Sequence, residues 1–293
     1  MRAAYLLLVA ANLVYATSYA ATRLVLDDVP PALLGLVRLV VGGAIVVAVA
    51  RLVEPTAAAP GRADARRMAW MGVCGFAAPF AFGNWGLTDS TATNAALLII
   101  VEPVAIIALG PAVLGEALTR REAAGAGLAL LGAIVVVVNG IPGVTHGVAP
   151  HWRGDLLLVL SGLAYASYTL LGRAVLRRHS ALAVTARSIV WGAIAMAPLA
   201  AIEWLAGARP RVDARGVGGA LYLAIVITAL GYLVWNWGLG RVGAPRAAIF
   251  VTLQPIAGAV LGVLLLREPL TAFTLAGGVL IVAGLWLTVT GRR

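Results

Sequence analysis

The sequence of 293 residues contains no lysine, so all 22 residues counted as Lys or Arg are arginines. A nucleotide-binding phosphate loop needs a lysine before Ser or Thr, and a Walker-type ATPase is therefore excluded. One cysteine, Cys74, cannot form a disulfide within the chain. His146, His151 and His179 lie apart in predicted loops, where we expect them to be solvated. We expect no metal, no cofactor and no enzyme activity, because the chain has no catalytic motif either.

Charged residues are also scarce, at 12% of the chain, whereas 61% of the residues are hydrophobic. A soluble protein needs more polar surface than this to cover its core. A helix needs about 20 apolar residues to cross the hydrocarbon core of a bilayer. Ten such segments are found, at residues 3–22, 31–52, 67–87, 91–114, 121–139, 154–173, 181–203, 215–239, 245–266 and 271–290. The sequence therefore predicts an all-α integral membrane protein with ten transmembrane helices in a lipid bilayer.

The arginines indicate how these helices are oriented. They lie mostly in the short gaps between segments, so the net charge of +10 fits membrane-surface loops, and we expect no nucleic-acid partner. Most of them fall on the side of the N-terminus, which predicts that both termini are cytoplasmic. Arg209, Arg211 and Arg215 fall on the opposite side and go against this rule.

The chain contains an internal repeat. The tetrapeptide Asn-Trp-Gly-Leu occurs at 84–87 and again at 236–239. Glu102-Pro103 corresponds at the same spacing to Gln254-Pro255. Other matched pairs are Arg38 with Arg187, Tyr15 with Tyr165, Gly125 with Gly277, and Gly132 with Gly284. Such a series of matches predicts two copies of one structural unit.

The repeat divides the chain into a first unit at 1–140, a linker at 141–153 and a second unit at 154–293. Each unit has five predicted helices. Five is an odd number, so the second unit enters the membrane from the opposite side and is inverted. Inverted repeats can exchange conformations and open a central site alternately to each side of the membrane. This symmetry favours a transporter over a receptor, an anchor or a membrane enzyme.

The turns of the two units carry a family resemblance. The Asn-x-x-Leu helix end, the Glu-Pro or Gln-Pro pair, and Gly-Glu-x-Leu-Thr at 115–119 resemble the EamA domain. The second copy has Arg267 in place of that glycine. This domain occurs twice in ten-helix members of the drug/metabolite transporter superfamily. The resemblance implies a multi-pass protein of a bacterial inner (cytoplasmic) membrane that is similar to exporters of amino acids, including aromatic ones.

Four charged or amide side chains inside the predicted helices are candidate functional residues. Glu102 is an acidic residue near the middle of a predicted helix, where a carboxylate is costly and hence a candidate for proton coupling or substrate contact. The alternative is a structural hydrogen bond to a carbonyl freed by Pro103, and its counterpart Gln254 cannot titrate. Arg38 and Arg187 could contact a substrate carboxylate, or they could extend to a membrane surface.

Aromatic and polar side chains at helical spacing predict the lining of a central cavity. The candidate substrate-binding residues are Asn12, Tyr15, Phe76, Phe80, Tyr165, Tyr168, Tyr232 and Trp235. The alternatives are polar contacts between helices and an aromatic belt at the membrane interface. Prolines in the helices are candidate hinges, namely Pro79, Pro103, Pro111 and Pro255.

Together these patterns predict a secondary transporter that exports amino acids or related small metabolites by alternating access. Its energy would come from a gradient of substrate or of ions such as protons. Transport of nucleotide-sugar, drug-like or lipid-type solutes is the alternative. A lipid-modifying membrane enzyme is less favoured, because it would need clustered His, Asp or Glu near one interface. The sequence leaves the oligomeric state open.

Overall fold

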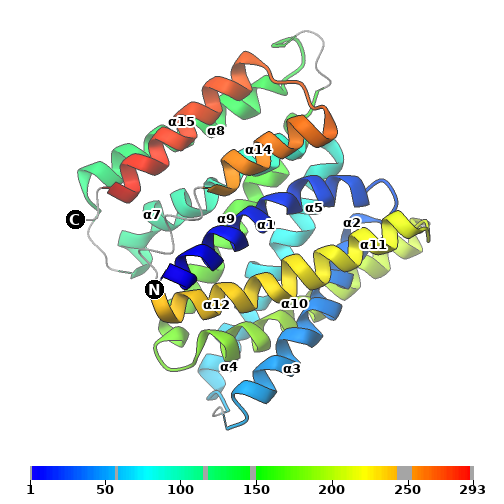
Figure 1. Ribbon diagram of the computed structural model, residues 1–293, viewed down its shortest axis with the longest axis vertical. Coiled ribbons are helices and arrows are strands. Elements are labelled where there is room, and N and C mark those ends of the chain that lie inside the picture. The colour runs from blue at the N-terminus through cyan, green and yellow to red at the C-terminus, as the bar shows by residue number, and fades with distance from the viewer. Residues whose placement is uncertain (1, 57–58, 115–117, 146–149, 243–252, 291–293) are drawn as a thin grey trace.

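A computed structural model describes residues 2–56, 59–114, 118–145, 150–242 and 253–290, and every regular element in these ranges is a helix (Figure 1). Six helical stretches are long and apolar enough to cross a membrane. They are Pro31–Val53, Ala92–Val113, Arg120–Asn139, Trp152–Leu176, Ala181–Leu205 and Ala214–Trp235, and shorter apolar helices cover Leu253–Leu266 and Ala272–Thr288. The predicted all-α class is confirmed for the described residues, and the long apolar helices agree with a membrane protein.

The helices follow one another in the order of the predicted segments. The first half of the chain forms α1 (Arg2–Val25), α2 (Pro31–Val37), η1 (Arg38–Gly42), α3 (Gly43–Val53), α4 (Arg62–Gly72), η2 (Val73–Ala77), α5 (Ala78–Asp89), α6 (Ala92–Leu98), α7 (Val101–Leu114) and α8 (Arg120–Asn139). The second half forms α9 (Trp152–Leu176), α10 (Ala181–Leu205), α11 (Ala214–Tyr222), η3 (Leu223–Leu230), α12 (Gly231–Val242), α14 (Leu253–Leu266) and α15 (Ala272–Thr290). The η elements are π-helical turns inside longer helices.

Within the predicted segment at 91–114, a turn at Ile99 and Ile100 separates two helices, although the whole stretch Ala92–Val113 is long and apolar enough to cross a membrane. α6 begins after Thr91, whose side chain accepts a hydrogen bond from the Asn94 backbone N–H, and it ends at Leu98. α7 begins at Val101, so Pro103 lies in its first turn. A proline is tolerated there because the first turn of a helix leaves its N–H groups unpaired. Pro103 thus lies near a helix start and does not bend a continuous helix.

The matched glycines bring α8 and α15 into contact along their length (Figure 1). A Cβ atom at Gly132 would lie 2.6 Å from the Gly277 carbonyl oxygen, and one at Gly284 would lie 2.5 Å from the Gly125 carbonyl oxygen. No side chain fits between these backbones. Close packing of small residues is a main source of helix association in membranes, where no hydrophobic force drives it. These glycines therefore serve packing within the chain.

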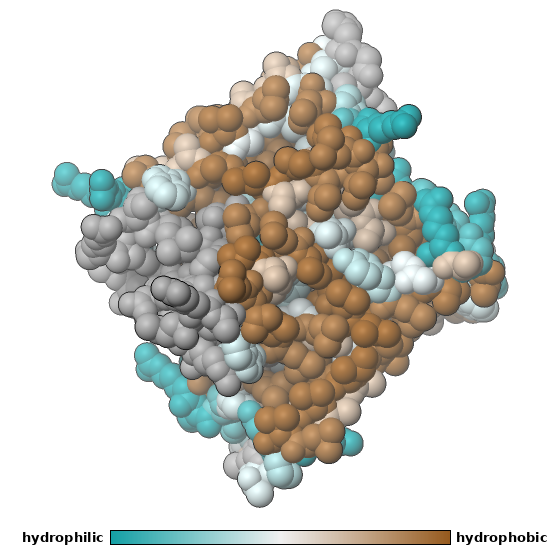
Figure 2. All heavy atoms as spheres, viewed as in Figure 1, coloured by the Kyte–Doolittle hydropathy of each residue, from teal (hydrophilic) through white to brown (hydrophobic). Residues whose placement is uncertain are grey.

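α14 packs against α1 and α6 and makes few contacts with α15. An apolar groove of about 920 Å³ lies between α14 and α15, and Leu97 and Trp286 are among its lining residues. Figure 2 shows that this face of the molecule is mostly apolar, with hydrophilic side chains toward its edges. Such a surface fits the hydrocarbon region of a bilayer.

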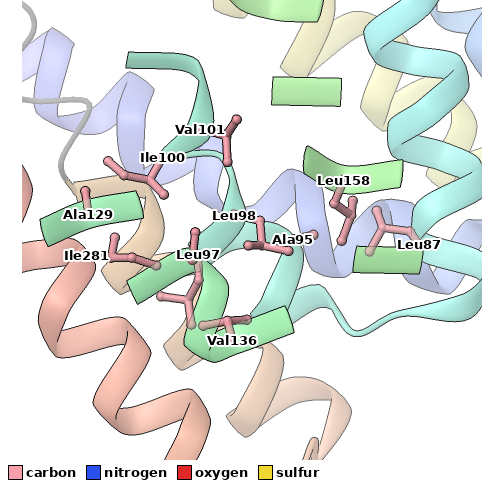
Figure 3. Close-up of a cluster of buried hydrophobic side chains, with 11 residues drawn as sticks. Leu87, Ala95, Leu97, Leu98, Ile100, Val101, Ala129, Val136, Leu158 and Ile281 are labelled. Carbon is pink, nitrogen blue, oxygen red and sulfur yellow. The ribbon is translucent and has the colours of Figure 1, made fainter. Parts of the chain in front are cut away.

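Short α6 is held at the centre of a buried apolar cluster (Figure 3). Its Leu98 is fully buried in this cluster, to which several other helices also contribute side chains. These include Leu87 of α5, Val136 of α8, Leu158 of α9 and Ile281 of α15. Their dense van der Waals contact fixes α6 between the two halves of the chain.

Candidate functional site

Arg38 is the residue around which the polar side chains of the interior gather. It begins η1 and is 8% exposed. Its Nε donates to Thr228 Oγ1 at 3.3 Å, and the Thr228 hydroxyl donates to the Leu223 carbonyl at 2.9 Å. Its guanidinium carbon lies 4.2 Å from the centre of the Phe80 ring, a cation–π contact. Arg38 therefore stays inside the protein and does not extend to a membrane surface.

Three π-helical turns of the described chain place residues at this site. η1 carries Arg38, η2 carries Phe76, and η3 carries Thr228. A π turn adds a residue to a helix and so re-aims the side chains that follow, and such turns are frequent at functional sites. A Cβ atom at Gly42 would lie 2.6 Å from the Ala224 carbonyl oxygen, so a glycine there lets η1 touch η3.

Aromatic rings from three helices form a wall beside Arg38. Phe76 contacts Tyr168 with ring centres 5.4 Å apart and Tyr232 with ring centres 5.3 Å apart. Phe80 meets Tyr165 edge to face at 6.4 Å. These are separations at which aromatic pairs attract each other. The five residues were predicted to share a cavity lining, and the structure brings them together.

Tyr15 joins the same group from α1. Its ring lies against the α12 backbone, since a Cβ atom at Gly231 would be 2.7 Å from it. Gly231 is the residue before Tyr232, so Tyr15 meets the helix that carries one of these rings. The site is thus built from α1, η1, η2 with α5, α9 and α12, which come from both halves of the chain.

Glu102 lies in the first turn of α7. The N-terminal end of a helix carries a partial positive charge that favours a carboxylate. The Ile99 carbonyl, which Pro103 leaves without its usual helical donor, accepts from the Glu102 backbone N–H at 3.1 Å. Among the described residues, the Glu102 carboxyl has no hydrogen bond and no ion pair.

Gln254, the repeat counterpart of Glu102, is bonded to α1. Its Nε2 donates to Asn12 Oδ1 at 2.8 Å, and its Oε1 accepts from the Tyr19 hydroxyl at 3.4 Å. Asn12 is completely buried and donates to the Leu8 carbonyl at 2.8 Å. Asn12 and Gln254 therefore hold α14 to α1. Tyr19 also belongs to this group, and the sequence analysis did not single it out as a binding residue.

The remaining candidates lie around this site. Trp235 is partly exposed on α12, three residues after Tyr232, and Arg187 is partly exposed on α10. Pro79 lies in the first turn of α5, where its carbonyl accepts from Ser161 Oγ at 2.9 Å. Two other predicted hinges are Pro111, inside α7, and Pro255, in the first turn of α14.

The sequence analysis missed a set of carboxylates that join the two halves at one end of the molecule. We call this the capped end and define it by Glu203, Glu268 and Asp155. Glu203 Oε2 accepts from the Ala32 backbone N–H at 2.8 Å, and Glu203 Oε1 accepts from Trp85 Nε1 at 2.7 Å. A carboxylate at a helix start satisfies free N–H groups and favours the helix dipole.

Glu268 makes the corresponding contact with α6. It accepts from the backbone N–H groups of Ala92 at 2.7 Å and Thr93 at 2.8 Å, and from the Thr93 hydroxyl at 2.6 Å. The sequence contained a hint, because Glu268 belongs to one of the two matched turns. Its partner helix, however, could not be read from the turn itself. Glu116, the repeat counterpart, lies outside the described residues.

Asp155 completes the capped end and corrects the expectation of solvated histidines. His151 is 6% exposed, and its Nδ1 lies 2.7 Å from Asp155 Oδ2. Asp155 also accepts hydrogen bonds from Ser90 and from Asn94, whose Nδ2 is 3.1 Å away. At the opposite end, His179 Nε2 lies 3.1 Å from Asp64 Oδ2. His146 lies outside the described residues.

The long apolar helices, together with side chains from both halves that meet around Arg38, are typical of a multi-pass membrane protein. The chain matches the EamA-like transporter family twice, at residues 2–138 and 152–290, and it belongs to this family of the drug/metabolite transporter superfamily. The family description identifies a transporter rather than an enzyme.

Relatives of the chain have been described by the solutes that they carry. A Salmonella typhimurium protein, 30% identical over 207 residues and 68% of each chain, is described as a probable amino-acid metabolite efflux pump. A Streptantibioticus cattleyicolor protein, 28% identical over 95% of this chain and 92% of its own length, is described as a probable terminal-alkyne amino-acid exporter. A solved crystal structure shares the fold, with a TM-score of 0.67 and 22% identity over 99% of this chain and 97% of that chain.

Proposed function

We propose that the protein is a secondary transporter that exports amino acids or related small metabolites by alternating access across a bacterial cytoplasmic membrane. The observation that carries the proposal is Arg38, a buried cation without a carboxylate partner among the described residues, beside aromatic rings from both halves. A carboxylate is a natural ligand for such a cation. The descriptions of the two relatives as an amino-acid metabolite efflux pump and an amino-acid exporter support the same class of solute.

We further propose that ten spans form two inverted units, 1–140 and 154–293, joined by the linker at 141–153, with both termini cytoplasmic. The arginine distribution then makes the capped end the outer end. Glu203 and Glu268 each belong to the second unit and bind a helix start in the first unit. Opening toward the outside would break these contacts, and closing would restore them.

Pro79, Pro103, Pro111 and Pro255 are proposed to act as hinges in this motion. Pro79, Pro103 and Pro255 each lie in the first turn of a helix. The helix of Pro79 follows the π turn η2, the helix of Pro103 follows the break after α6, and the helix of Pro255 follows a segment that is not described. The ends of helices are places where a few residues can absorb large changes of backbone dihedral angles. The candidate lining residues Trp235, Asn12 and Tyr168 would move with the helices that carry them.

The test is exchange of labelled amino acids in proteoliposomes loaded with an excess of the same unlabelled compound. We expect saturable exchange of a subset of amino acids, lost in Arg38→Gln and retained in Arg66→Gln. Arg66 is a suitable control because it is an exposed arginine of α4. Absence of exchange across a complete panel, with correctly folded protein, would contradict the proposed substrate class and favour nucleotide-sugar, drug-like or lipid-type solutes.

A further inference from the structure

A group of buried polar side chains lies at the capped end, where the two halves of the chain meet. His151 directly precedes α9, and Asp155 lies one turn further along the same helix. Asn94 belongs to α6, and Asn139 is the last residue of α8. All four side chains are buried. Buried polar groups need hydrogen-bond partners, so the positions of the protons in this group matter to the fit between the two halves.

The hydrogen bonds around Asn139 fix which nitrogen of His151 carries the proton. Asn139 Oδ1 accepts from the hydroxyls of Thr145 at 2.9 Å and Thr271 at 3.0 Å. The amide nitrogen of Asn139 therefore faces His151 Nε2, at 3.4 Å, and donates to it. An accepting Nε2 carries no proton, so the proton of the ring is on Nδ1, which donates to Asp155 Oδ2 at 2.7 Å. The hydrogen bonds are thus complete only when His151 is neutral.

A second proton on His151 would disturb this arrangement. It would place an N–H on Nε2, opposite the N–H groups of the Asn139 amide. The amide would have to rotate to offer its oxygen, and the hydroxyls of Thr145 and Thr271 would lose their acceptor. Thr271 follows Glu268 by three residues, and its Oγ1 accepts from the Thr274 backbone N–H at 3.1 Å at the start of α15. Protonation of His151 is therefore transmitted to the segment that carries Glu268.

The attraction between His151 and Asp155 does not decide whether this end is open or closed. Both residues belong to the start of α9, four positions apart, so the pair can persist in either state. The contacts with the first half are the ones that change on opening, namely Asn139 with His151 and Asn94 Nδ2 with the two Asp155 oxygens at 3.1 and 3.3 Å. A charged ring is also costlier to bury than a neutral one. The closed end thus favours neutral His151.

The described elements packed around His151 contribute few other charges. The titratable group in contact with its ring is Asp155. The neighbouring segments supply neutral polar side chains, namely Asn94, Asn139 and Ser90. Of the other charged residues at this end, Asp89 and Arg153 are exposed, and Glu268 is bonded to the start of α6. Within the described part of the chain, His151 is therefore the group through which a proton can act on the Asn139 contact.

We propose that His151 is a proton-binding site that controls the capped end, so that acid favours its opening. Histidine is the side chain whose charge ordinarily changes between about pH 5 and 8. A proton that binds the open form more tightly than the closed form shifts the equilibrium toward the open form. The inference rests on the proposed alternating access, and it is independent of the solute that is carried and of Glu102.

The test measures how often a buried contact at this end opens, in purified full-length protein without substrate. The parent protein carries one cysteine, introduced as Ala96→Cys together with Cys74→Ser, at the fully buried contact of α6 with α14. Its labelling by a soluble maleimide is followed at pH 5 and pH 8. The reactive thiolate fraction of any cysteine rises with pH. Each rate is therefore divided by the rate of Asp89→Cys, an exposed site at the same end, measured in the Cys74→Ser background.

We expect the normalised rate of the parent to be about tenfold higher at pH 5 than at pH 8, which corresponds to about 1.4 kcal/mol. His151→Asn keeps an N–H donor near the place of Nδ1 but cannot bind a second proton, so its two normalised rates should be equal. His179→Asn is the matched control, because His179 pairs with Asp64 at the opposite end. It should keep the tenfold ratio, and so should His146→Asn in the linker.

Each outcome has a distinct meaning. Equal normalised rates at the two pH values in the parent would overturn the inference without any further variant. Acid acceleration that persists in His151→Asn would also overturn it, and would assign the response to carboxylates such as Glu268. Thr271→Val should already react faster than the parent at pH 8 and respond less to acid; a parent-like rate and ratio would contradict the route through Asn139.

The inference and the proposed function fail in different ways. Acid-dependent opening of a protein that exchanges no amino acid in proteoliposomes would contradict the proposed substrate class and support the inference. Amino-acid exchange by a protein whose capped end opens equally at pH 5 and pH 8 would overturn the inference and leave the proposed function standing.

Discussion

Removal of the Glu268 carboxylate tests the idea that the capped end closes the transporter on one side. Glu268 accepts hydrogen bonds from Ala92 N, Thr93 N and Thr93 Oγ1 at 2.7, 2.8 and 2.6 Å. A buried hydrogen bond to a charged group contributes about 1.5–3 kcal/mol. Glu268 is partly exposed, so each bond is better valued at about 1 kcal/mol. Glu268→Ala should therefore destabilise the closed end by about 3 kcal/mol.

A change of about 3 kcal/mol shifts the equilibrium toward the open end about 100-fold. Opening of this end can be followed with a single cysteine, introduced as Ala96→Cys after the native cysteine is removed by Cys74→Ser. Ala96 is suitable because it is fully buried where α6 meets α14. Its reaction with a soluble maleimide in detergent measures how often this contact opens. Labelling should be much faster in Glu268→Ala than in the parent, with Glu268→Gln between the two.

Asp89→Ala provides the matched control. Asp89 is an exposed carboxylate at the last residue of α5, on the same end of the molecule. Its removal changes the local charge without removing a helix cap, so labelling should stay at the parent rate. Equal rates in Glu268→Ala and the parent would refute the conclusion that Glu268 holds this end closed. Equal acceleration in Asp89→Ala would show a general charge effect instead.

Three further outcomes are expected. Gly132→Leu should lower the free energy of unfolding by about 1–3 kcal/mol, because any side chain there meets the α15 backbone; a thermal melt checks this, with Gly127→Leu as an unaffected control, since a Cβ atom there meets nothing within 4 Å. Asn12→Leu should cost about 1–3 kcal/mol by leaving the Gln254 amide unpaired, and loss of the effect in Asn12→Leu/Gln254→Leu would show the coupling in melting temperature. If protons drive transport through Glu102, Glu102→Gln should abolish uptake driven by an imposed pH gradient while exchange continues; uptake that still follows the gradient would exclude Glu102 as the coupling site.

Composition and hydrophobic segment length predicted the helical membrane fold, because the bilayer allows few other solutions for the backbone. The same patterns could not show where a helix is interrupted. Between Ala95 and Leu114 the only polar side chain is Glu102, so no periodicity marks the break between Leu98 and Val101. α6 packs against helices that are distant in the sequence, among them α9, α14 and α15, and such contacts cannot be read from the local sequence.

The candidate site was predicted in part. The aromatic wall was expected from helical spacing, and its rings do come together. The position of Arg38 could not be predicted, because its distance from a helix end fits an extended surface arginine equally well. Thr228, whose hydroxyl accepts a hydrogen bond from Arg38 inside the protein, is 190 residues away in the chain. His151 was misjudged for the same reason, since it is buried by contacts with Asn94 and Asn139 from other helices.

The repeat explains the shared architecture, and the differences between its copies explain where the chemistry lies. Gln254 is hydrogen-bonded to Asn12 and Tyr19, whereas the Glu102 carboxyl at the matching position has no hydrogen bond within the described part of the chain. Arg38 is buried against Phe80, whereas its counterpart Arg187 is partly exposed. A strictly symmetric protein would place equivalent charges on both sides of the central axis. Arg38, Phe76 and Phe80 come from the first half of the chain, whereas Tyr165, Tyr168 and Tyr232 come from the second. We expect a site with this asymmetry to hold an asymmetric solute in one orientation.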